Sequence, residues 1–202
     1  MTAHARSKSD KPSKTSKGPG RSLMERAALR SRSVLLFGPI ESALTRDVVR
    51  QILILDQMSQ TKPITVYVNS PGGLADDGFA IYDVLRFVRA PVTTVVTGLA
   101  ASAATIVMVG APKDRRFVLP HSRIMLHQPS TGIRGTASDI AISAKEILRL
   151  RHKANELFVR ETGKPIDVIE RDMHRDFWMS AQEAVDYGLL TKVVDSATDL
   201  PS

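Results

Sequence analysis

Residues 92–110 read VTTVVTGLAASAATIVMVG, and no charged residue occurs between Ala90 and Pro112. The β-branched residues of the first part are typical of a buried strand, and the alanine-rich second part is typical of a buried helix. The stretch is long enough to cross a bilayer, but its threonines and glycines make it only weakly apolar. It therefore predicts a strand over 92–98 and a helix over 102–109, with its single serine, Ser102, where they meet.

The rest of the chain continues this alternation of strands and helices. We expect further strands at 33–38, 64–69, 115–119, 123–127 and 189–194, and further helices at 41–58, 76–89, 136–161 and 180–188. Thr136 with Asp139, and the sequence SAQE at 180–183, have the spacing of capping boxes that begin helices. Strands that alternate with helices form mainly parallel sheets, so the sequence predicts a single α/β domain.

Apolar residues recur at helical spacing in the three longest predicted helices. They are Leu44, Val48, Ile52 and Leu55 in the first, Ile81, Val84, Leu85 and Val88 in the second, and Ile140, Ala144, Ile147, Ala154 and Phe158 in the third. We expect each of these faces to be buried.

The net charge of +7 is concentrated at the N-terminus of the 202-residue chain. Residues 1–22 carry six Lys or Arg against one Asp and almost no apolar residue, so burial cannot offset the entropy lost on ordering them. We therefore expect a disordered basic tail at 1–22, a folded domain at 23–196 and a C-terminal tail at 197–202. The basic tail lacks the apolar segment of a secretory signal; a transit peptide or a nucleic-acid-binding arm is a weaker alternative to a solvated tail.

Residue types also limit the chemistry. The chain has no cysteine, which excludes disulfides, thiolate catalysis and cysteine-based zinc sites. No pair among its five histidines has the spacing of a helical metal site, so we expect no metal. A cytoplasmic location is the simpler expectation for such a chain.

Ser102 is a candidate nucleophile because it precedes the predicted helix. Backbone N–H groups at that position could stabilise an anionic intermediate of acyl transfer. A small polar residue that fills a tight strand–helix crossing is the alternative, and a single serine does not make a triad. The G-x-S-x-G motif of hydrolases is absent, because Ala100 and Ala104 occupy its glycine positions.

The sequence NSPGG at 69–73 places two glycines directly after a predicted strand. Glycines allow bare backbone N–H groups to approach a ligand closely, so this segment is a candidate oxyanion donor. An ordinary strand-to-helix turn explains it equally well. The spacing matches neither a P-loop nor G-x-G-x-x-G, which leaves nucleotide binding with little support.

A base and a carboxylate are available elsewhere in the chain. His127 ends an apolar strand and enters a glycine-containing loop, where a base would be both fixed and accessible. In ERDMHRDFW at 170–178, Asp172 and Asp176 lie beside an aromatic pair that we expect to be buried. A carboxylate there needs a partner, and either a histidine or a neighbouring arginine would serve; spacing does not choose between the two aspartates.

Taken together, these segments resemble the proteolytic subunit family of the Clp protease, ClpP, over about residues 30–196. The matching stretches, in the family's order, are YVNSPGG, GFAIYD, GLAAS, LPHSRIMLHQP, TASDIAISAKEIL and RDFWMSAQEAVDYGLL. The resemblance implies a serine endopeptidase with a crotonase-like spiral of βαβ units and a protruding handle helix. It assigns Ser102, His127 and Asp176 as the catalytic triad, and the backbone N–H groups of Gly73 and Ala103 as the oxyanion hole.

The resemblance also implies partners. Two stacked heptameric rings would enclose the sites, and an AAA+ Clp unfoldase would supply unfolded polypeptide. ATP would be used by that unfoldase, so no cofactor is expected in this subunit, and neither a membrane nor a nucleic acid is an expected partner. Tyr67, Phe87 and Phe117 match aromatic positions near the family's unfoldase-docking surface, although core aromatics explain them equally well.

The sequence departs from the family pattern in three places. Ala103 and Ala104 follow the serine where the family has Met-Gly or Ala-Gly, STG at 130–132 replaces a glycine pair, and the basic tail replaces the gating segment. Two other functions are therefore kept as alternatives. One is an impaired ring subunit that works with an active paralogue, and the other is a crotonase-fold acyl-CoA enzyme.

Overall fold

The computed structural model describes residues 19–130 and 132–201. Its elements are α1 (Pro19–Ser31), β1 (Ser33–Phe37), α2 (Ser42–Met58), β2 (Ile64–Ser70), α3 (Ala75–Phe87), β3 (Val92–Ala101), α4 (Ala103–Met108), η1 (Lys113–Arg115), β4 (Arg116–Val118), β5 (Arg123–Leu126), α5 (Ala137–Thr162), α6 (Ile166–Asp172), β6 (Phe177–Ser180), α7 (Ala181–Asp186), β7 (Lys192–Val193) and η2 (Ala197–Asp199). The predicted alternation of strands and helices is confirmed.

The sheet is mainly parallel, as predicted. Its order is β1-β2-β3-β4-β7, with β5 also paired to β3 and β6 paired to β5. All pairings are parallel except β5–β6, which is antiparallel. The sequence did not predict β6 or α6, because both are short and carry no apolar period of their own.

Along one edge, strand β3 pairs with two different strands in turn. Residues 94–96 pair with β4 and residues 99–101 pair with β5. Gly98 lies at the change of partner with φ +100°, a conformation that favours glycine. The buried Ser122 hydroxyl bridges the gap, because it accepts from the Gly98 N–H and donates to the Val96 carbonyl. This change of partner carries the end of β3 toward β5, and so toward His127.

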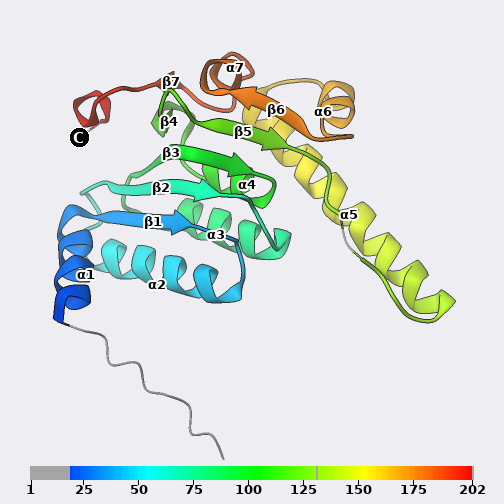
Figure 1. Cartoon of the computed structure of the whole chain (residues 1–202), viewed down its shortest axis with the longest axis horizontal. Helices are drawn as coiled ribbons and strands as arrows, with labels where there is room; N and C mark the ends of the chain where they lie inside the picture. The colour runs from blue at the N-terminus through cyan, green and yellow to red at the C-terminus, as the bar shows by residue number, and fades with distance from the viewer. Residues whose placement is uncertain (1–18, 131, 202) are drawn as a thin grey trace, which may run out of the picture.

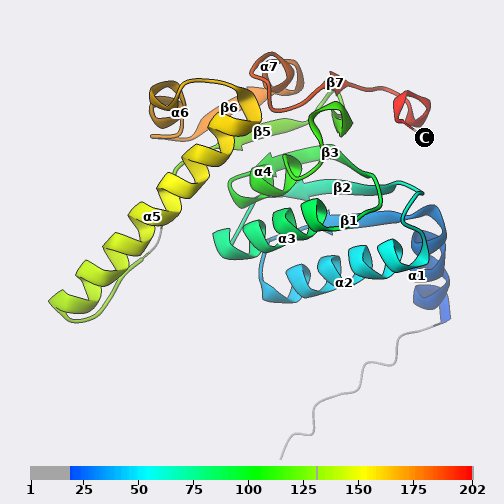
Figure 2. The same cartoon turned by 180° about the vertical axis from the view of Figure 1, so that it is seen from behind.

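Three helices cover one face of the sheet. Figure 1 shows β1, β2 and β3 in front, and Figure 2 shows α2, α3 and α4 in front of them from behind. Side chains alternate along β1: Val34 and Leu36 are fully buried, whereas Leu35 is 53 % exposed and Phe37 is 47 % exposed. The helix-covered face therefore forms the core, and the opposite face of β1 stays open in the single chain.

The predicted apolar faces of α2 and α3 pack into this core. Val48, Ile52 and Leu55 are fully or almost fully buried, and so are Ile81 and Leu85. This burial is the main source of stability, at about 25 cal/mol per Å² of apolar surface removed from water.

Helix α5 is buried only in its second half. Ala154 and Phe158 lie in the core, but Ile140, on the same predicted face, is 44 % exposed. Figures 1 and 2 show why: the first half of α5 projects away from the rest of the molecule. The predicted capping boxes at Thr136 and Ser180 are both present.

The ends of the chain differ from the expected boundaries by a few residues. Helix α1 begins at Pro19, inside the segment expected to be a tail, and residues 197–199 form a short 3-10 helix. The remainder of the expected basic tail, residues 1–18, lies outside the described residues. Among the described residues, no helix is long and apolar enough to span a membrane, and the 92–110 stretch forms β3 and α4 as predicted.

Candidate active site

Ser102 lies between β3 and α4 in a strained backbone conformation. Its φ of 54° and ψ of −126° are unusual for a residue other than glycine. The turn is held by a hydrogen bond from the Ser102 N–H to the Met125 carbonyl, at 2.9 Å. The Ser102 carbonyl accepts from the backbone and the hydroxyl of Thr105, at 2.9 and 2.6 Å. Neighbouring elements thus fix the serine in a conformation that it would rarely adopt alone.

The two alanines after Ser102 are compatible with this turn. Ala103 and Ala104 are the first residues of α4, and both are buried. A Cβ atom on Gly78 of α3 would lie 3.0 Å from the Ala103 carbonyl oxygen. The close packing of α3 on α4 therefore depends on small residues on both helices.

The two glycines of the 69–73 segment pack tightly against neighbouring backbone, Gly72 at Ser102 and Gly73 at Ile40. A Cβ atom on Gly72 would come within 2.7 Å of the Ser102 Cβ, and one on Gly73 within 2.0 Å of the Ile40 carbonyl oxygen. Their φ angles are +92° and +154°. In the part of the chain that the structure describes, no hydrogen bond occupies the N–H of Gly73 or of Ala103. Both donors are thus free beside the serine.

His127 and Asp176 complete a chain of hydrogen bonds that starts at Ser102. The His127 Nε2 lies 2.7 Å from the Ser102 Oγ, and the His127 Nδ1 lies 3.1 Å from the Asp176 Oδ1. If Nδ1–H donates to the carboxylate, Nε2 is left as an acceptor for the serine hydroxyl. The three residues come from the end of β3, the end of β5 and the segment before β6.

Asp172, the other candidate carboxylate, lies in a different environment. It accepts from the Arg171 guanidinium at 2.8 Å and from the Tyr187 hydroxyl at 2.9 Å. Burial raises the pKa of Tyr187, and the hydrogen bond to the Asp172 carboxylate raises it further. Of the two aspartates that spacing left open, the structure brings Asp176 to the histidine and ties Asp172 to an arginine.

The expectation of a buried aromatic pair beside Asp176 was wrong. Phe177 is half-buried, but Trp178 is 46 % exposed. The Arg123 guanidinium stacks over the Trp178 ring, with its central carbon 4.7 Å from the ring centroid. The Asp176 side chain is itself 62 % exposed in the single chain. Trp178 faces outward because side chains alternate along β6, and the neighbouring Met179 takes the buried side at 4% exposure.

A cavity of about 640 Å³ opens beside the serine. Its lining includes Gly73, Ser102, Ala103 and His127. Its apolar wall comes mainly from α4 and α5, and the residues that form it are Ile106, Ile147, Leu150, Ala154, Phe158 and Met173. Charged residues of α3 and α5 also line it, namely Asp76, Asp77, Glu146, Arg149 and Lys153. The cavity is large enough for side chains of an extended peptide.

The other histidines lie away from this arrangement in the described region. His121 and His174 are exposed, and His152 pairs with Glu156 on the surface of α5. No group of three possible metal ligands occurs among residues 19–130 and 132–201. A hydroxyl, a base, a carboxylate and two free N–H groups are the parts required for acyl transfer from an amide or ester.

Sequence reasoning did not single out Gln128 as part of the site. The only signal for it was its position immediately after the candidate base. Its side chain and backbone both contact the segment that carries Asp176.

The chain is similar to known proteins along most of its length. A family model described as Clp protease matches residues 19–197. The ATP-dependent Clp protease proteolytic subunit 2 of Treponema denticola is 46% identical over 173 residues, which cover 86% of each chain. Subunit 1 of Protochlamydia amoebophila is 43% identical over 204 residues, covering 100% of this chain and 97% of the relative. A solved structure, that of a point mutant of ClpP1 from Listeria monocytogenes, matches with a TM-score of 0.82 and 37% identity, covering 88% of this chain and 99% of that one.

Proposed function

Because the chain belongs to the Clp protease family, we propose that it is the proteolytic subunit of an ATP-dependent protease that degrades unfolded proteins. The proposed catalytic triad is Ser102, His127 and Asp176. Members of this family are serine peptidases. The observation that carries the proposal is the continuous hydrogen-bond chain from the Ser102 hydroxyl through the imidazole to the Asp176 carboxylate, next to two free N–H groups.

In the first half of the proposed reaction, the Ser102 Oγ attacks the carbonyl carbon of the scissile peptide bond. His127 Nε2 takes the hydroxyl proton, and Asp176 holds the imidazole in the productive tautomer. The N–H groups of Gly73 and Ala103 donate to the oxygen that becomes negatively charged. The tetrahedral intermediate then collapses, the peptide C–N bond breaks, and His127 gives its proton to the leaving amine.

The second half of the reaction releases the acyl group from the serine. His127 takes a proton from a water molecule as that water attacks the ester carbon. The ester C–O bond breaks, the proton returns to the Ser102 Oγ, and the new carboxylic acid leaves. The subunit itself needs no cofactor for this sequence, and hydrolysis of ATP belongs to a partner unfoldase.

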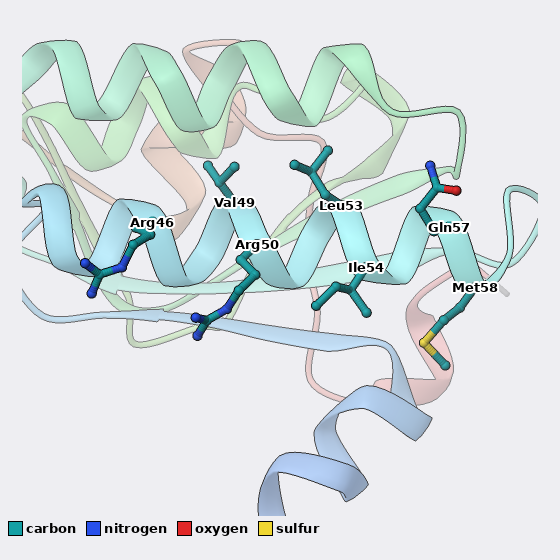
Figure 3. Close-up of a pocket in the computed structure, with 7 residues that line it drawn as sticks. All are labelled: Arg46, Val49, Arg50, Leu53, Ile54, Gln57 and Met58. Atoms are coloured by element: carbon teal, nitrogen blue, oxygen red, sulfur yellow. The ribbon is translucent and has the colours of Figure 1, made fainter. Parts of the chain in front are cut away.

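Exposed apolar surfaces support an oligomeric assembly, which we propose to be two stacked heptameric rings. One surface lies on α2, where a groove is lined by Arg46, Val49, Arg50, Leu53, Ile54, Gln57 and Met58 (Figure 3). Another is the projecting half of α5, where Ile142 is 64 % exposed and Leu148 is 60 % exposed. Monomeric proteins rarely expose several apolar patches of this kind.

We propose that an AAA+ unfoldase is the partner that supplies polypeptide to the assembly, and that the assembly works in the cytoplasm. Three aromatics are expected near the docking surface. Phe117 is buried and Tyr67 packs against it, whereas Phe87 is 80 % exposed. The names of the relatives, which describe them as subunits of an ATP-dependent protease, support an ATP-using partner.

A peptidase assay on the sized, full-length particle tests this function. We expect the particle to hydrolyse a fluorogenic peptide and Ser102→Ala to abolish the hydrolysis while leaving the particle intact. A wild-type particle that hydrolyses peptides only after co-expression with a second ClpP-like subunit would support the impaired-subunit alternative instead. No hydrolysis under either condition would contradict the proposal.

A further inference from the structure

The carboxylate of Asp176 has little to hold it in place apart from the histidine. It lies on the segment 173–176, between the end of α6 and the start of β6. Its side chain is 62 % exposed, and His127 is the one hydrogen-bond partner of that carboxylate in the described chain. The position of Asp176 must therefore be set by the backbone of this segment.

Both ends of the segment are fixed. At its start, Asp172 just before the segment accepts a hydrogen bond from the Tyr187 hydroxyl. Met173, the first residue of the segment, is 3% exposed and donates its N–H to the Ile169 carbonyl at 2.9 Å. After it, Phe177 pairs with Leu126 in the β5–β6 ladder. The three residues between these anchors, which include Asp176, are all exposed.

Gln128 binds this segment at two consecutive carbonyl groups. Its backbone N–H donates to the Met173 carbonyl at 2.7 Å, and its side-chain Nε2 donates to the His174 carbonyl at 2.9 Å. Because Gln128 directly follows His127, these bonds tie the segment that carries the base to the segment that carries the carboxylate. On the other side of His127 and Asp176, the ladder pair Leu126–Phe177 joins the same two segments.

We propose that Gln128 is a positioning residue that holds the Asp176 carboxylate within hydrogen-bond distance of His127. The inference deepens the proposed function, on which it rests. A displacement of about 1 Å in a catalytic group can cost on the order of 100-fold in rate, so a bond that limits movement of an exposed segment affects the reaction even though Gln128 touches no reacting atom.

The chemistry of the side chain fits this role. A glutamine amide is a neutral donor, so it bonds the His174 carbonyl without adding a charge beside the imidazole. Pro129, the next residue, disfavours a helical conformation at Gln128 and so keeps the chain extended as it leaves β5. A glutamate would have the same reach but would offer an ionised acceptor to a carbonyl oxygen.

A double-mutant cycle on the full-length particle tests the proposal. The variants are Gln128→Ala, Asp176→Ala and the pair together, and the readouts are kcat and KM for a peptide and the rate at which a fluorophosphonate labels Ser102. We expect Gln128→Ala to lower kcat and the labelling rate by about 10- to 100-fold, with KM changed less than about twofold. In the Asp176→Ala background, the same change should cost less than about twofold, because the group that it positions is gone.

Matched variants separate positioning from a general loss of stability. Gln182 donates a side-chain hydrogen bond to Asp186 on the surface of α7, and Gln182→Ala should keep wild-type rates. Gln128→Met keeps the length of the side chain but removes its donor, so it should lower the rates as much as Gln128→Ala does. It takes the place of the alanine variant if that variant folds poorly.

Two results would overturn the proposal. One is a rate of Gln128→Ala and Gln128→Met within about twofold of the wild type, and the other is an equal loss in the presence and absence of the Asp176 carboxylate. A wild-type particle that the probe does not label would instead contradict the proposed function, and with it the basis of the positioning role.

Discussion

At the scale of single residues, the backbone of Ser102 decides whether the site can work. A φ of 54° costs a non-glycine residue of order 1–3 kcal/mol, and such strain persists only where the surroundings fix it. The surroundings here are the bond to Met125 and the close approach of Gly72. Replacement of the family's glycine by Ala104 does not disturb this turn, because Ala104 lies inside α4 and needs no special conformation.

We expect Gly72→Ala to reduce the reactivity of Ser102. The new methyl group would lie 2.6 Å from the Ala101 carbonyl oxygen and 2.7 Å from the Ser102 Cβ, and backbone would have to shift to make room. The rate of fluorophosphonate labelling should fall at least about tenfold, since small displacements of a nucleophile are costly. The rate is measured by intact mass as a function of time.

Gly163→Ala is the matched control for that variant. Gly163 also has a positive φ, +79°, but nothing lies within 4 Å of its added Cβ. This change should cost about 1 kcal/mol of stability and leave labelling unchanged. Equal labelling rates for the two variants would show that the contact at Gly72 is unimportant.

Much of the site could be predicted from sequence, but its geometry could not. The glycines of the 69–73 segment and a histidine at a strand end were visible as candidates from local patterns. The choice of Asp176 over Asp172 needed the family resemblance, because the two lie on the same short segment and differ only in their tertiary partners. The positioning role of Gln128 could not be predicted from the sequence, since a glutamine beside a proline has no distinctive pattern.

At the scale of elements, a buried polar network holds the second half of α5 to the sheet. Arg116 of β4 donates to Glu161 of α5 at 2.5 Å, and the Tyr82 hydroxyl of α3 donates to the same carboxylate at 3.1 Å. Burial alone would raise the pKa of Glu161, but Arg116 outweighs it, helped by Arg160 and Tyr82, and holds this pKa below its usual value. Because α5 also lines the cavity, the network keeps one wall of the site in place.

We expect Glu161→Gln to destabilise the protein at pH 7 by about 3 kcal/mol or more, because it leaves the almost fully buried Arg116 without a countercharge. Thermal unfolding at a fixed protein concentration measures the effect. Glu156→Gln, on the exposed surface of the same helix, should stay within about 0.5 kcal/mol of the wild type. A similar loss in both variants would contradict the role of the network.

The difference in stability between the wild type and Glu161→Gln should depend on pH in a defined way. A carboxylate whose pKa is lowered by folding contributes its full stability above the pKa of the unfolded chain, about 4.3, and loses it as the pH falls through the lower folded value. The stability difference between wild type and Glu161→Gln should therefore be constant from pH 7 to about pH 5 and shrink below that. A difference that grows on acidification would contradict the assignment.

The elements that sequence missed have a common physical cause. Helix α6 and strand β6 are too short to show a hydrophobic period, and β6 exists through its antiparallel pairing with β5. Helix α5 was predicted correctly in its position and caps, but the burial of its whole apolar face was not borne out in the single chain, where Ile140 is exposed. Local patterns identify an amphipathic helix without saying what covers its face.

At the scale of the whole molecule, the exposed apolar surfaces of α2 and α5 indicate contacts with other subunits. Ile54 is 43 % exposed on the α2 groove, next to Met58 at 60 % (Figure 3). Such side chains contribute little to the stability of one chain while they stay in water, and they stabilise an assembly when they are buried in it.

We expect Ile54→Lys to shift the particle toward smaller species without unfolding the subunit. The lysine remains solvated in the single chain, but an interface would bury its charge without a partner. Native mass spectrometry gives the distribution of species, and Thr198→Lys on the exposed η2 segment serves as a control. An unchanged distribution in Ile54→Lys would remove the α2 groove from the assembly.

The role of Ser102 as the nucleophile is tested most directly by covalent labelling of the assembled wild-type protein with a fluorophosphonate, followed by peptide mapping. We predict one adduct per chain, on Ser102, with labelling abolished by Ser102→Ala and strongly slowed by His127→Ala. No adduct on an assembled wild-type particle, or an adduct that persists in Ser102→Ala, would contradict the claim that this serine is the nucleophile.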